Sequence, residues 1–358
     1  MHFRNIRQSA LLAYSDDLID DEEFALIYDS FLSKNPDLTY YRDNINFDLD
    51  NFSDDECKTL FRFQKNDIYD LVDVFNVPDP VVCYNRVNVP QVEALCVLLK
   101  RLAYPCRYSD MLPIFGRNVP QLSIVTNTLL NYLFERWGSL LSDFNQPWLN
   151  SHSLQSYARA VSDKGAALDN CWGFVDGTVR PCCRPNQDQR LLYNGHKRVH
   201  AIKFQSVVAP NGLIANLYGP VEGCRHDSGM LAMSGLYPQL QQHAMDPQGN
   251  ILCIYGDPAY PLRPQLMCPF QGAFLSPDET VFNSSMSQVR VAVEWVFNDI
   301  SNYFKFIDFK KNLKVGLSPV GKTYLVCGLL HNARTMLYGN VTSKYFDIDP
   351  PDIYSYFV

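Results

Sequence analysis

Hydrophobic residues follow two different periods along the chain, and the change of period divides it into two parts. Before about residue 150, apolar residues recur every three or four positions, which is the spacing of helices that bury one face. From Cys171 onward, short apolar runs are bounded by glycine, proline and asparagine, a pattern typical of strands. We therefore expect a helical domain over residues 55–150 and a second domain, built on a sheet, over residues 168–340.

The first part contains two well-marked helices. Residues 53–56 have the sequence of an N-cap and a first turn, which predicts a helix from there to about Phe75. Residues 91–103 predict a second helix that Pro105 ends, and one face of it carries Leu95, Leu98, Leu99 and Leu102.

Residues 108–137 have the sequence of a helix-turn-helix, with a Gly-containing turn at 116–120 and a proline near the start of the second helix. The second helix would bury Leu122, Val125, Leu129 and Leu133. It would direct Gln121, Ser123, Thr126 and Asn127 outward, where they could contact a DNA groove. Two features count against DNA reading: Pro113 lies inside the first helix, and Arg117 is the only cation near the start of the second. A purely structural helical bundle is an equal alternative.

The remaining stretches of the chain connect or flank these parts. Residues 1–54 form an acidic lead-in, partly ordered, with one helix near Glu22 to Leu32. The domain boundary falls between Gln146 and Asp169, where proline, serine and glycine are frequent. Residues 341–358 form an aromatic, acidic tail that we expect to dock on its own domain.

In the second part, four strands and two helices follow in a defined order. Strands are predicted at 171–175, 200–209, 213–219 and 251–255, with a turn at 210–212 between the second and the third. Helices are predicted at 228–243 and 289–304. The order strand, strand, strand, helix, strand, helix is that of a ribonuclease-H-like domain. The fold class is therefore α/β, with a mixed sheet flanked by helices and an all-α domain before it, and the first and fourth strands lie side by side and parallel.

Composition limits the class of protein. The chain has 358 residues, of which 47% are hydrophobic and 19% charged, as in ordinary folded proteins. Its formal charge of −7 means that any contact with nucleic acid depends on local basic patches. No stretch of about 18 apolar residues predicts a membrane span, and the N-terminus lacks the apolar segment of a signal peptide. Eleven cysteines without a CxxC pair indicate reduced thiols in an intracellular protein.

Three carboxylates stand where such a fold would bring them together. Asp176 and Asp257 each follow an apolar run, and Glu294 lies on the last predicted helix. A buried carboxylate requires a metal, a cation or several donors. Two strand-end acids and one helix acid are the residue types of a two-metal phosphodiester site, because Mg²⁺ prefers oxygen ligands. Gly177 and Gly256 would let phosphate and metal approach the backbone.

Each carboxylate also has a simpler interpretation. Asp176 and Asp257 could be turn-forming residues at strand ends. Glu294 could be a solvated helix residue, with room for a surface pair with Arg290, four residues earlier. Asp227 could cap the helix that begins there, or it could be a fourth metal ligand. The type, order and spacing of the three acids favour one common site.

Basic residues supply candidates for contact with DNA phosphates. They lie in the helix-turn-helix segment, in the stretch from Arg180 to Lys203, and in a lysine cluster after residue 304. The individual candidates are Arg117, Gln121, Arg184, Lys197, Arg198, Lys310 and Lys311. For the lysine cluster, a solvated surface is the simpler interpretation.

Residues from about Gly173 to Tyr338 resemble the DDE nuclease domain of PIF/Harbinger transposases and of the Harbinger-derived nucleases of animals. The resemblance is carried in order by Phe174–Thr178, Tyr193–Lys197, His226–Ser228, Tyr255–Pro261 and Arg290–Phe297. By motif, Asp176, Asp257 and Glu294 match the catalytic triad of that family, and Asp227 matches a residue often counted as a fourth metal ligand. The sequence departs from the family at Val179, at Pro258–Ala259 and at Trp295, without loss of a carboxylate.

The resemblance implies a Mg²⁺- or Mn²⁺-dependent DNA endonuclease or transposase that uses two ions for hydrolysis and strand transfer. It also implies a nuclear location, with a cytoplasmic share left open, and a separate Myb-like DNA-binding partner. The alternative is a domesticated module that binds DNA or protein without turnover. Oligomeric state stays open.

Overall fold

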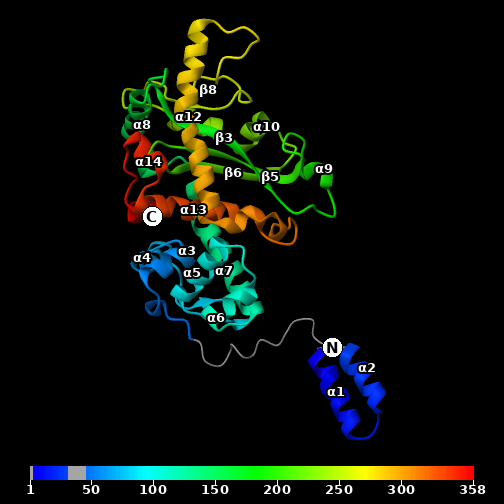
Figure 1. Ribbon diagram of the computed structural model, residues 1–358. Coiled ribbons are helices and arrows are strands. Elements are labelled where there is room, and N and C mark those ends of the chain that lie inside the picture. Colours follow the sequence, from blue (N-terminus) through cyan, green and yellow to red (C-terminus); the bar gives the residue numbers. More distant parts are fainter. Residues whose placement is uncertain (1–2, 31–45) are drawn as a thin grey trace.

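The computed structural model describes residues 3–30 and 46–358. At the N-terminus, α1 (Phe3–Ser15) and α2 (Asp21–Ser30) pack against each other (Figure 1). The side chain of Asp20 accepts the backbone N–H groups of Glu22 and Glu23, which fixes the start of α2. This is the helix predicted near Glu22, and its predicted last residues, 31 and 32, lie outside the described residues.

The helical region runs from residue 49 to residue 141. Its longer helices are α3 (Asp54–Phe61), α4 (Lys65–Val74), α5 (Gln91–Ala103) and α7 (Val119–Trp137), and a small hairpin pairs β1 (Val81–Val82) with β2 (Asn88–Val89). Ser53 and Glu56 form the capping box at the start of α3. The single helix predicted from there to Phe75 is wrong, because Arg62 adopts a left-handed conformation (φ 72°) and separates α3 from α4.

The segment predicted as a helix-turn-helix has a very short first helix. A 3-10 turn, Tyr108–Met111, is followed by α6 (Leu112–Phe115), which carries Pro113 in its first turn and ends at Gly116 in a left-handed conformation. In α7 the four predicted core residues are buried. Thr126 is buried as well, contrary to the prediction, and its hydroxyl donates to the Leu122 carbonyl. DNA reading by this segment stays a prediction.

The stretch predicted as a domain boundary is folded. It contains α8 (Ser151–Asp163), which Asn150 caps and which packs against the first strand of the sheet. Sequence reading missed this helix because its serines and its short apolar face resemble a linker. Its apolar face buries Leu154, Tyr157, Ala158 and Val161.

A six-stranded mixed sheet forms the centre of the second part (Figure 1). Its strands are β3 (Cys171–Pro181), β4 (Tyr193–Asn194), β5 (Val199–Val208), β6 (Ile214–Glu222), β7 (Cys253–Tyr255) and β8 (Leu266–Met267). β3 pairs parallel with β7 and antiparallel with β5, and β7 pairs parallel with β8. The predicted parallel neighbours are therefore confirmed, and the mixed sheet flanked by helices is consistent with a ribonuclease-H-like domain.

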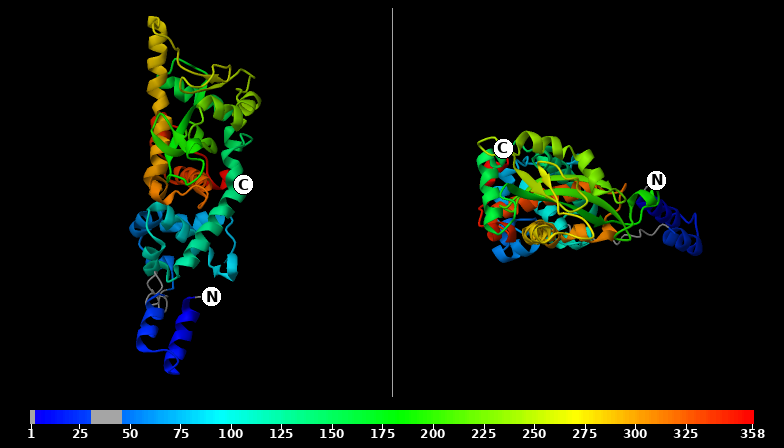
Figure 2. Two further views of the ribbon diagram at one scale, coloured as in Figure 1. Left: turned by 90° about the vertical axis from the view of Figure 1, so that its right-hand side faces the viewer. Right: turned by 90° about the horizontal axis from the view of Figure 1, so that it is seen from above.

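Helices cover this sheet. They are α9 (Gln189–Leu192), α10 (Asp227–Ser234), α11 (Leu236–His243), α12 (Pro277–Tyr303) and α13 (Val320–Tyr338). The single helix predicted at 228–243 is divided at Gly235, which has φ 64°. α12 is longer than predicted, because the capping box of Ser276 and Glu279 starts it 12 residues before Val289. Figure 2 shows it running along one side of the sheet.

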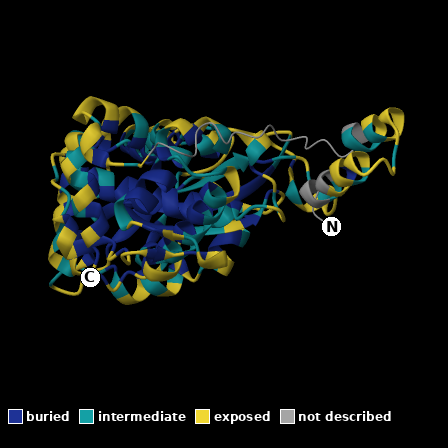
Figure 3. Cartoon of the chain, turned by 90° about the horizontal axis from the view of Figure 1, so that it is seen from below, coloured by how far each residue is buried: buried dark blue, intermediate teal, exposed yellow. Residues whose placement is uncertain are grey.

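One continuous hydrophobic core joins the helical region to the sheet. Figure 3 shows the buried residues gathered in the interior, with exposed residues around them. α13 lies between them and contacts both α7 and β6 (Figure 1). The tail forms α14 (Val341–Phe346) and α15 (Ile353–Tyr356) and packs on its own chain, as predicted. It also contacts the helical region, because the Phe357 ring packs on Phe75 and Trp137. Within residues 3–30 and 46–358, no helix is long and apolar enough to cross a membrane.

Candidate active site

Two neighbouring parallel strands position the first two acids. Phe174 in β3 pairs with Tyr255 in β7, and Asp176 and Asp257 each lie two residues beyond this pair. β7 ends at Tyr255, so Asp257 follows a strand end as predicted. Asp176 does not: β3 continues against β5 as far as Pro181, and Asp176 pairs with Ser206. The interpretation of Asp176 as a turn residue is therefore wrong.

The glycines beside these acids make room for protein groups. A Cβ atom on Gly177 would lie 2.7 Å from Oδ1 of Asp227, and one on Gly256 would lie 2.8 Å from both Tyr260 Cδ2 and Val175 Cγ1. The packing therefore does not support the prediction that the two glycines let phosphate and metal approach the backbone. Their lack of a side chain lets Asp227 and Tyr260 close in on the two strands.

We expect Gly256→Ala to lower the free energy of unfolding by about 1–3 kcal/mol, the usual cost of inserting a methyl group into a packed core. The new methyl group must displace Tyr260, which is 2% exposed, or Val175. Urea denaturation measures the change. Gly195→Ala is the matched control, because nothing lies within 4 Å of the Cβ position at Gly195. Equal stability of the two variants would contradict the packing described.

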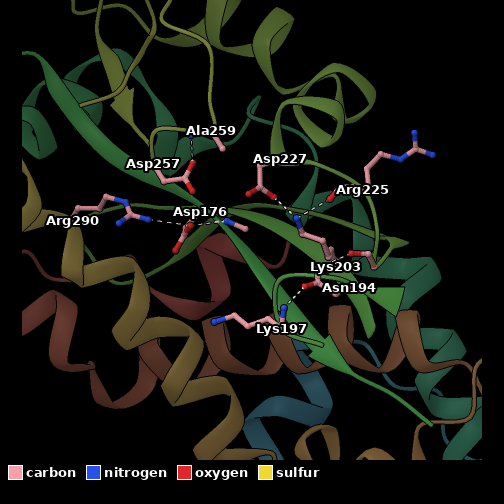
Figure 4. Close-up of polar contacts among 11 residues, drawn as sticks. Asp176, Asn194, Lys197, Lys203, Arg225, Asp227, Asp257, Ala259 and Arg290 are labelled. Atoms are coloured by element: carbon pink, nitrogen blue, oxygen red, sulfur yellow. Dashed lines mark hydrogen bonds and ion pairs between the residues drawn. The ribbon is translucent and has the colours of Figure 1, made fainter. Parts of the chain in front are cut away.

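Asp176 is the most perturbed of the acids. Burial raises its pKa to about 6, against an ordinary value of 3.8, and the charges of Asp257 and Glu294 act in the same direction. An ion pair with Arg290 (Nη2 to Oδ1, 3.1 Å) and the backbone N–H of Gly177 (2.9 Å to Oδ1) oppose this rise. Asp257 and Glu294 therefore lie near enough for their charges to act on Asp176, and Figure 4 shows Asp176 and Asp257 close together.

Asp257 is also partly buried, and burial raises its pKa. The backbone N–H of Ala259 donates to its Oδ1 at 3.0 Å and opposes the rise, while the charge of Asp227 adds to it. Asp227 therefore belongs electrostatically to the same cluster of carboxylates. Clusters of acids that stay close despite their mutual repulsion are typical of functional sites.

Glu294 lies on α12, and its charge acts on Asp176. The buried stripe of Val289, Ala292, Val293 and Val296 holds α12 against β3, and Glu294 itself is exposed. Arg290, one helical turn earlier, forms its ion pair with Asp176. The interpretation of Arg290 and Glu294 as a surface pair is therefore wrong.

Asp227 does not cap α10. It is the first residue of that helix, after His226, and no side-chain capping bond is formed. Its Oδ1 contacts Nζ of the buried Lys203 at 2.6 Å, and the same ammonium group donates to the Arg225 carbonyl at 2.9 Å (Figure 4). Sequence reading missed Lys203 because a lysine within an apolar strand carries no sign of its partner. A role for Asp227 as a metal ligand stays a prediction.

The donor set suits a divalent cation in its chemistry. The side chains present carboxylate oxygens and no sulfur or imidazole, as Mg²⁺ and Mn²⁺ require. Oδ2 of Asp176 has no donor among the described residues, so it is available to an ion. In the arrangement of the described residues, however, no three acidic, histidine or cysteine side chains converge into a closed metal-binding group.

The two candidates for DNA contact in the helical region have structural partners. Arg117 forms a two-point ion pair with Glu93, with Nη2 at 2.8 Å from Oε2, and Glu93 is 6% exposed. Gln121 closes the capping box of α7 with Asn118. Both side chains thus already have protein partners, and their contact with DNA stays a prediction.

Substitution of Arg117 by alanine tests this structural role. Because Glu93 would keep a buried charge without a partner, we expect the free energy of unfolding to fall by about 3 kcal/mol. Urea denaturation measures the loss, with the exposed Arg107→Ala as control. Unchanged stability together with weaker DNA binding would instead favour a DNA-reading role.

The other candidates lie on the surface of the sheet domain. Lys197 and Arg198 are exposed on the loop between β4 and β5, which Asn194 shapes by accepting the Lys197 backbone N–H at 2.8 Å. Figure 4 shows Lys197 on the same side of the sheet as Asp176. Lys310 and Lys311 are exposed. Their segment lies beside that of Arg184, because the backbone N–H of Cys183 donates to the Leu313 carbonyl. The structure thus brings together basic residues from two distant parts of the chain.

Comparison with known proteins agrees with this geometry. Residues 175–332 match the family model described as DDE superfamily endonuclease. This part of the chain is therefore similar to DDE superfamily endonuclease domains. The match lies within the residues whose motifs carried the resemblance, and that resemblance is confirmed.

A relative of the chain comes from a plant. The protein ALP1-like of Arabidopsis thaliana is 24% identical over 260 residues, which is 67% of this chain and 59% of that protein. The chain thus spans only 59% of the length of that relative. No solved structure matches the chain.

Proposed function

We propose that the chain is a divalent-metal-dependent DNA endonuclease of the transposase type. The observation that carries the proposal is the parallel pairing of β3 with β7, which places Asp176 beside Asp257 where the charge of Glu294 also acts. Enzymes of the DDE superfamily generally use divalent metals. Asp176, Asp257 and Glu294 would hold Mg²⁺ or Mn²⁺, in two sites, with Asp227 as a fourth candidate ligand. The ions would supply Lewis-acid stabilisation of the attacking and leaving oxygens.

The chain's own residues would bind and orient the DNA strand. Lys197 and Arg198 on one side, and Arg184, Lys310 and Lys311 on another, would contact phosphates and offset the chain's net negative charge. Arg117 and Gln121 are weaker candidates, because they already have protein partners. The resemblance to Harbinger proteins further supports a nuclear location and a Myb-like partner that supplies DNA binding.

A second candidate function is a DNA- or protein-binding module without turnover. The observation that favours it is the Arg290 guanidinium on Asp176, because a cation supplied by the protein neutralises the central acid without metal. The fourth carboxylate, Asp227, is likewise paired with Lys203.

Nicking of supercoiled plasmid DNA by the full chain separates the two functions. Reactions contain Mg²⁺, Mn²⁺, Ca²⁺ or EDTA, with and without nuclear extract as a source of a partner protein. The nuclease proposal predicts nicking with Mg²⁺ and Mn²⁺ that EDTA abolishes. DNA binding without nicking under every condition would support the binding module and overturn the nuclease.

A further inference from the structure

The ion pair between Arg290 and Asp176 leaves the two oxygens of this carboxylate in different situations. Oδ1 lies 3.1 Å from Nη2 of Arg290 and accepts the backbone N–H of Gly177 at 2.9 Å. Oδ2 has no donor among the described residues. In Figure 4 both dashed lines of Asp176 meet at one oxygen. The acid therefore offers one free oxygen and one that a protein cation already neutralises.

Arg290 is loosely held compared with another buried arginine of the same region. In both arginines Nε is buried and has no hydrogen-bond partner among the described residues. The Nη groups make the difference: those of Arg180 donate to Ser301 Oγ at 2.6 Å, to the Tyr324 hydroxyl at 3.1 Å and to the Phe297 carbonyl at 3.2 Å. Arg180 is thus fixed between β3, α12 and α13, whereas Arg290 is held in the site by a single ion pair. A guanidinium group with so few bonds loses little when it leaves.

A divalent ion and this guanidinium group compete for the same oxygen. Mg²⁺ binds carboxylate oxygens at about 2.0–2.1 Å, and a cation at that distance from Oδ1 would lie against the positively charged Nη2. One ion can bind through Oδ2 of Asp176 while the ion pair stays intact. A second ion bound to the same carboxylate needs Oδ1, from which Arg290 must first move away.

We propose that the Arg290 guanidinium group acts as a placeholder cation: it occupies the position of the second metal ion in the protein without DNA. It moves away from Asp176 when a DNA phosphate attracts it. This inference rests on the proposed nuclease function. Arginine binds phosphate through two parallel N–H bonds, which are stronger than its single contact in this structure. DNA binding and second-ion binding are then coupled, and each strengthens the other. The protein without DNA holds an incomplete metal site, which limits cleavage to bound DNA. Arg290 acts in this account as a positioning residue.

The coupling predicts opposite effects of one substitution on two ligands. Arg290→Gln removes the competing charge, so Mn²⁺ should bind to a second site in the absence of DNA, with an affinity raised by about tenfold or more over wild type. The same substitution removes a phosphate contact, so DNA binding in Ca²⁺ should weaken several-fold. Arg290→Lys keeps the charge and should still bind one ion without DNA.

Manganese titration of the full chain tests the inference. The electron paramagnetic resonance signal of free Mn²⁺ gives the number of bound ions for wild type, Arg290→Gln, Arg290→Lys and Arg225→Gln, with and without a short phosphorothioate duplex. Arg225→Gln is the matched control, because its exposed side chain pairs with Glu222 and touches no acid of the site. Thermal melting of each variant verifies that it is folded.

The expected result is one ion for wild type and for Arg225→Gln without DNA, two with the duplex, and two for Arg290→Gln in both conditions. In the absence of DNA, two ions on wild type, or the same number on wild type and folded Arg290→Gln, would overturn the proposed role of Arg290 and leave the nuclease proposal standing. Absence of Mn²⁺ binding from every variant, with and without DNA, would overturn the nuclease proposal and this inference together.

Discussion

Asp257→Asn lowers metal-dependent DNA cleavage by about a thousandfold or more if the three acids hold the metal ions. The amide keeps the shape of the side chain, and its oxygen can still accept the Ala259 N–H. The substitution removes the negative charge that a divalent ion requires. Each tenfold decrease in rate corresponds to a loss of about 1.4 kcal/mol of transition-state stabilisation. Glu294→Gln should cause a loss of similar size, because Glu294 acts on the same site from α12.

Cleavage of a supercoiled plasmid under single-turnover conditions measures this loss. Asp169→Asn is the matched control, because it removes one exposed carboxylate just before β3 and leaves the site intact. The control should retain full activity. Activity of Asp257→Asn within about tenfold of wild type would mean that Asp257 is no metal ligand, and the two-strand site would have to be abandoned.

Asp176→Asn should raise the stability of the fold while it abolishes activity. The pKa of Asp176 is raised from 3.8 to about 6 in the folded chain, so the folded state binds the proton more tightly than the unfolded state. The free energy of unfolding therefore falls as the pH rises from about 4 to 6, and the ionised carboxyl destabilises the protein above that range. The cost at neutral pH is about 2–3 kcal/mol, at 1.36 kcal/mol for each unit of pKa.

Urea denaturation at several pH values tests this expectation. The stability of Asp176→Asn relative to wild type should grow between pH 4 and pH 6 and then level off. Asp169→Asn controls for the removal of one negative charge. A difference that does not change with pH, or a variant that is less stable than wild type at pH 7, would show that Arg290 and the Gly177 N–H outweigh burial at this site.

The sequence predicted the elements that position the acids better than the contacts the acids make. Apolar runs before Asp176 and Asp257 were sufficient to predict two parallel strands, because a strand buried on both faces has few alternatives. The antiparallel continuation of β3 past Asp176 was missed, because its second half (Gly-Thr-Val-Arg-Pro) has the composition of a turn. α8 was missed for a similar reason.

Side-chain partners depend on the tertiary fold, and the sequence could not predict them. Arg290 and Glu294 are four residues apart on one helix, and local spacing favoured a pair between them. In the structure, α12 packs over β3 and Arg290 instead faces Asp176. Lys203 and Asp227 lie on β5 and α10, and only the packing of that helix on the sheet brings them together. Arg117, predicted to contact DNA, is held by Glu93 from α5.

Anomalous X-ray scattering from a crystal of the full chain soaked in Mn²⁺ tests most directly whether Asp176, Asp257 and Glu294 together hold divalent ions. The account predicts an anomalous peak about 2.1–2.3 Å from carboxylate oxygens of both Asp176 and Asp257. A second peak beside Glu294 should accompany movement of Arg290 away from Asp176. A Mn²⁺-soaked crystal with no peak at these acids, and with Arg290 still on Asp176, would contradict the claim.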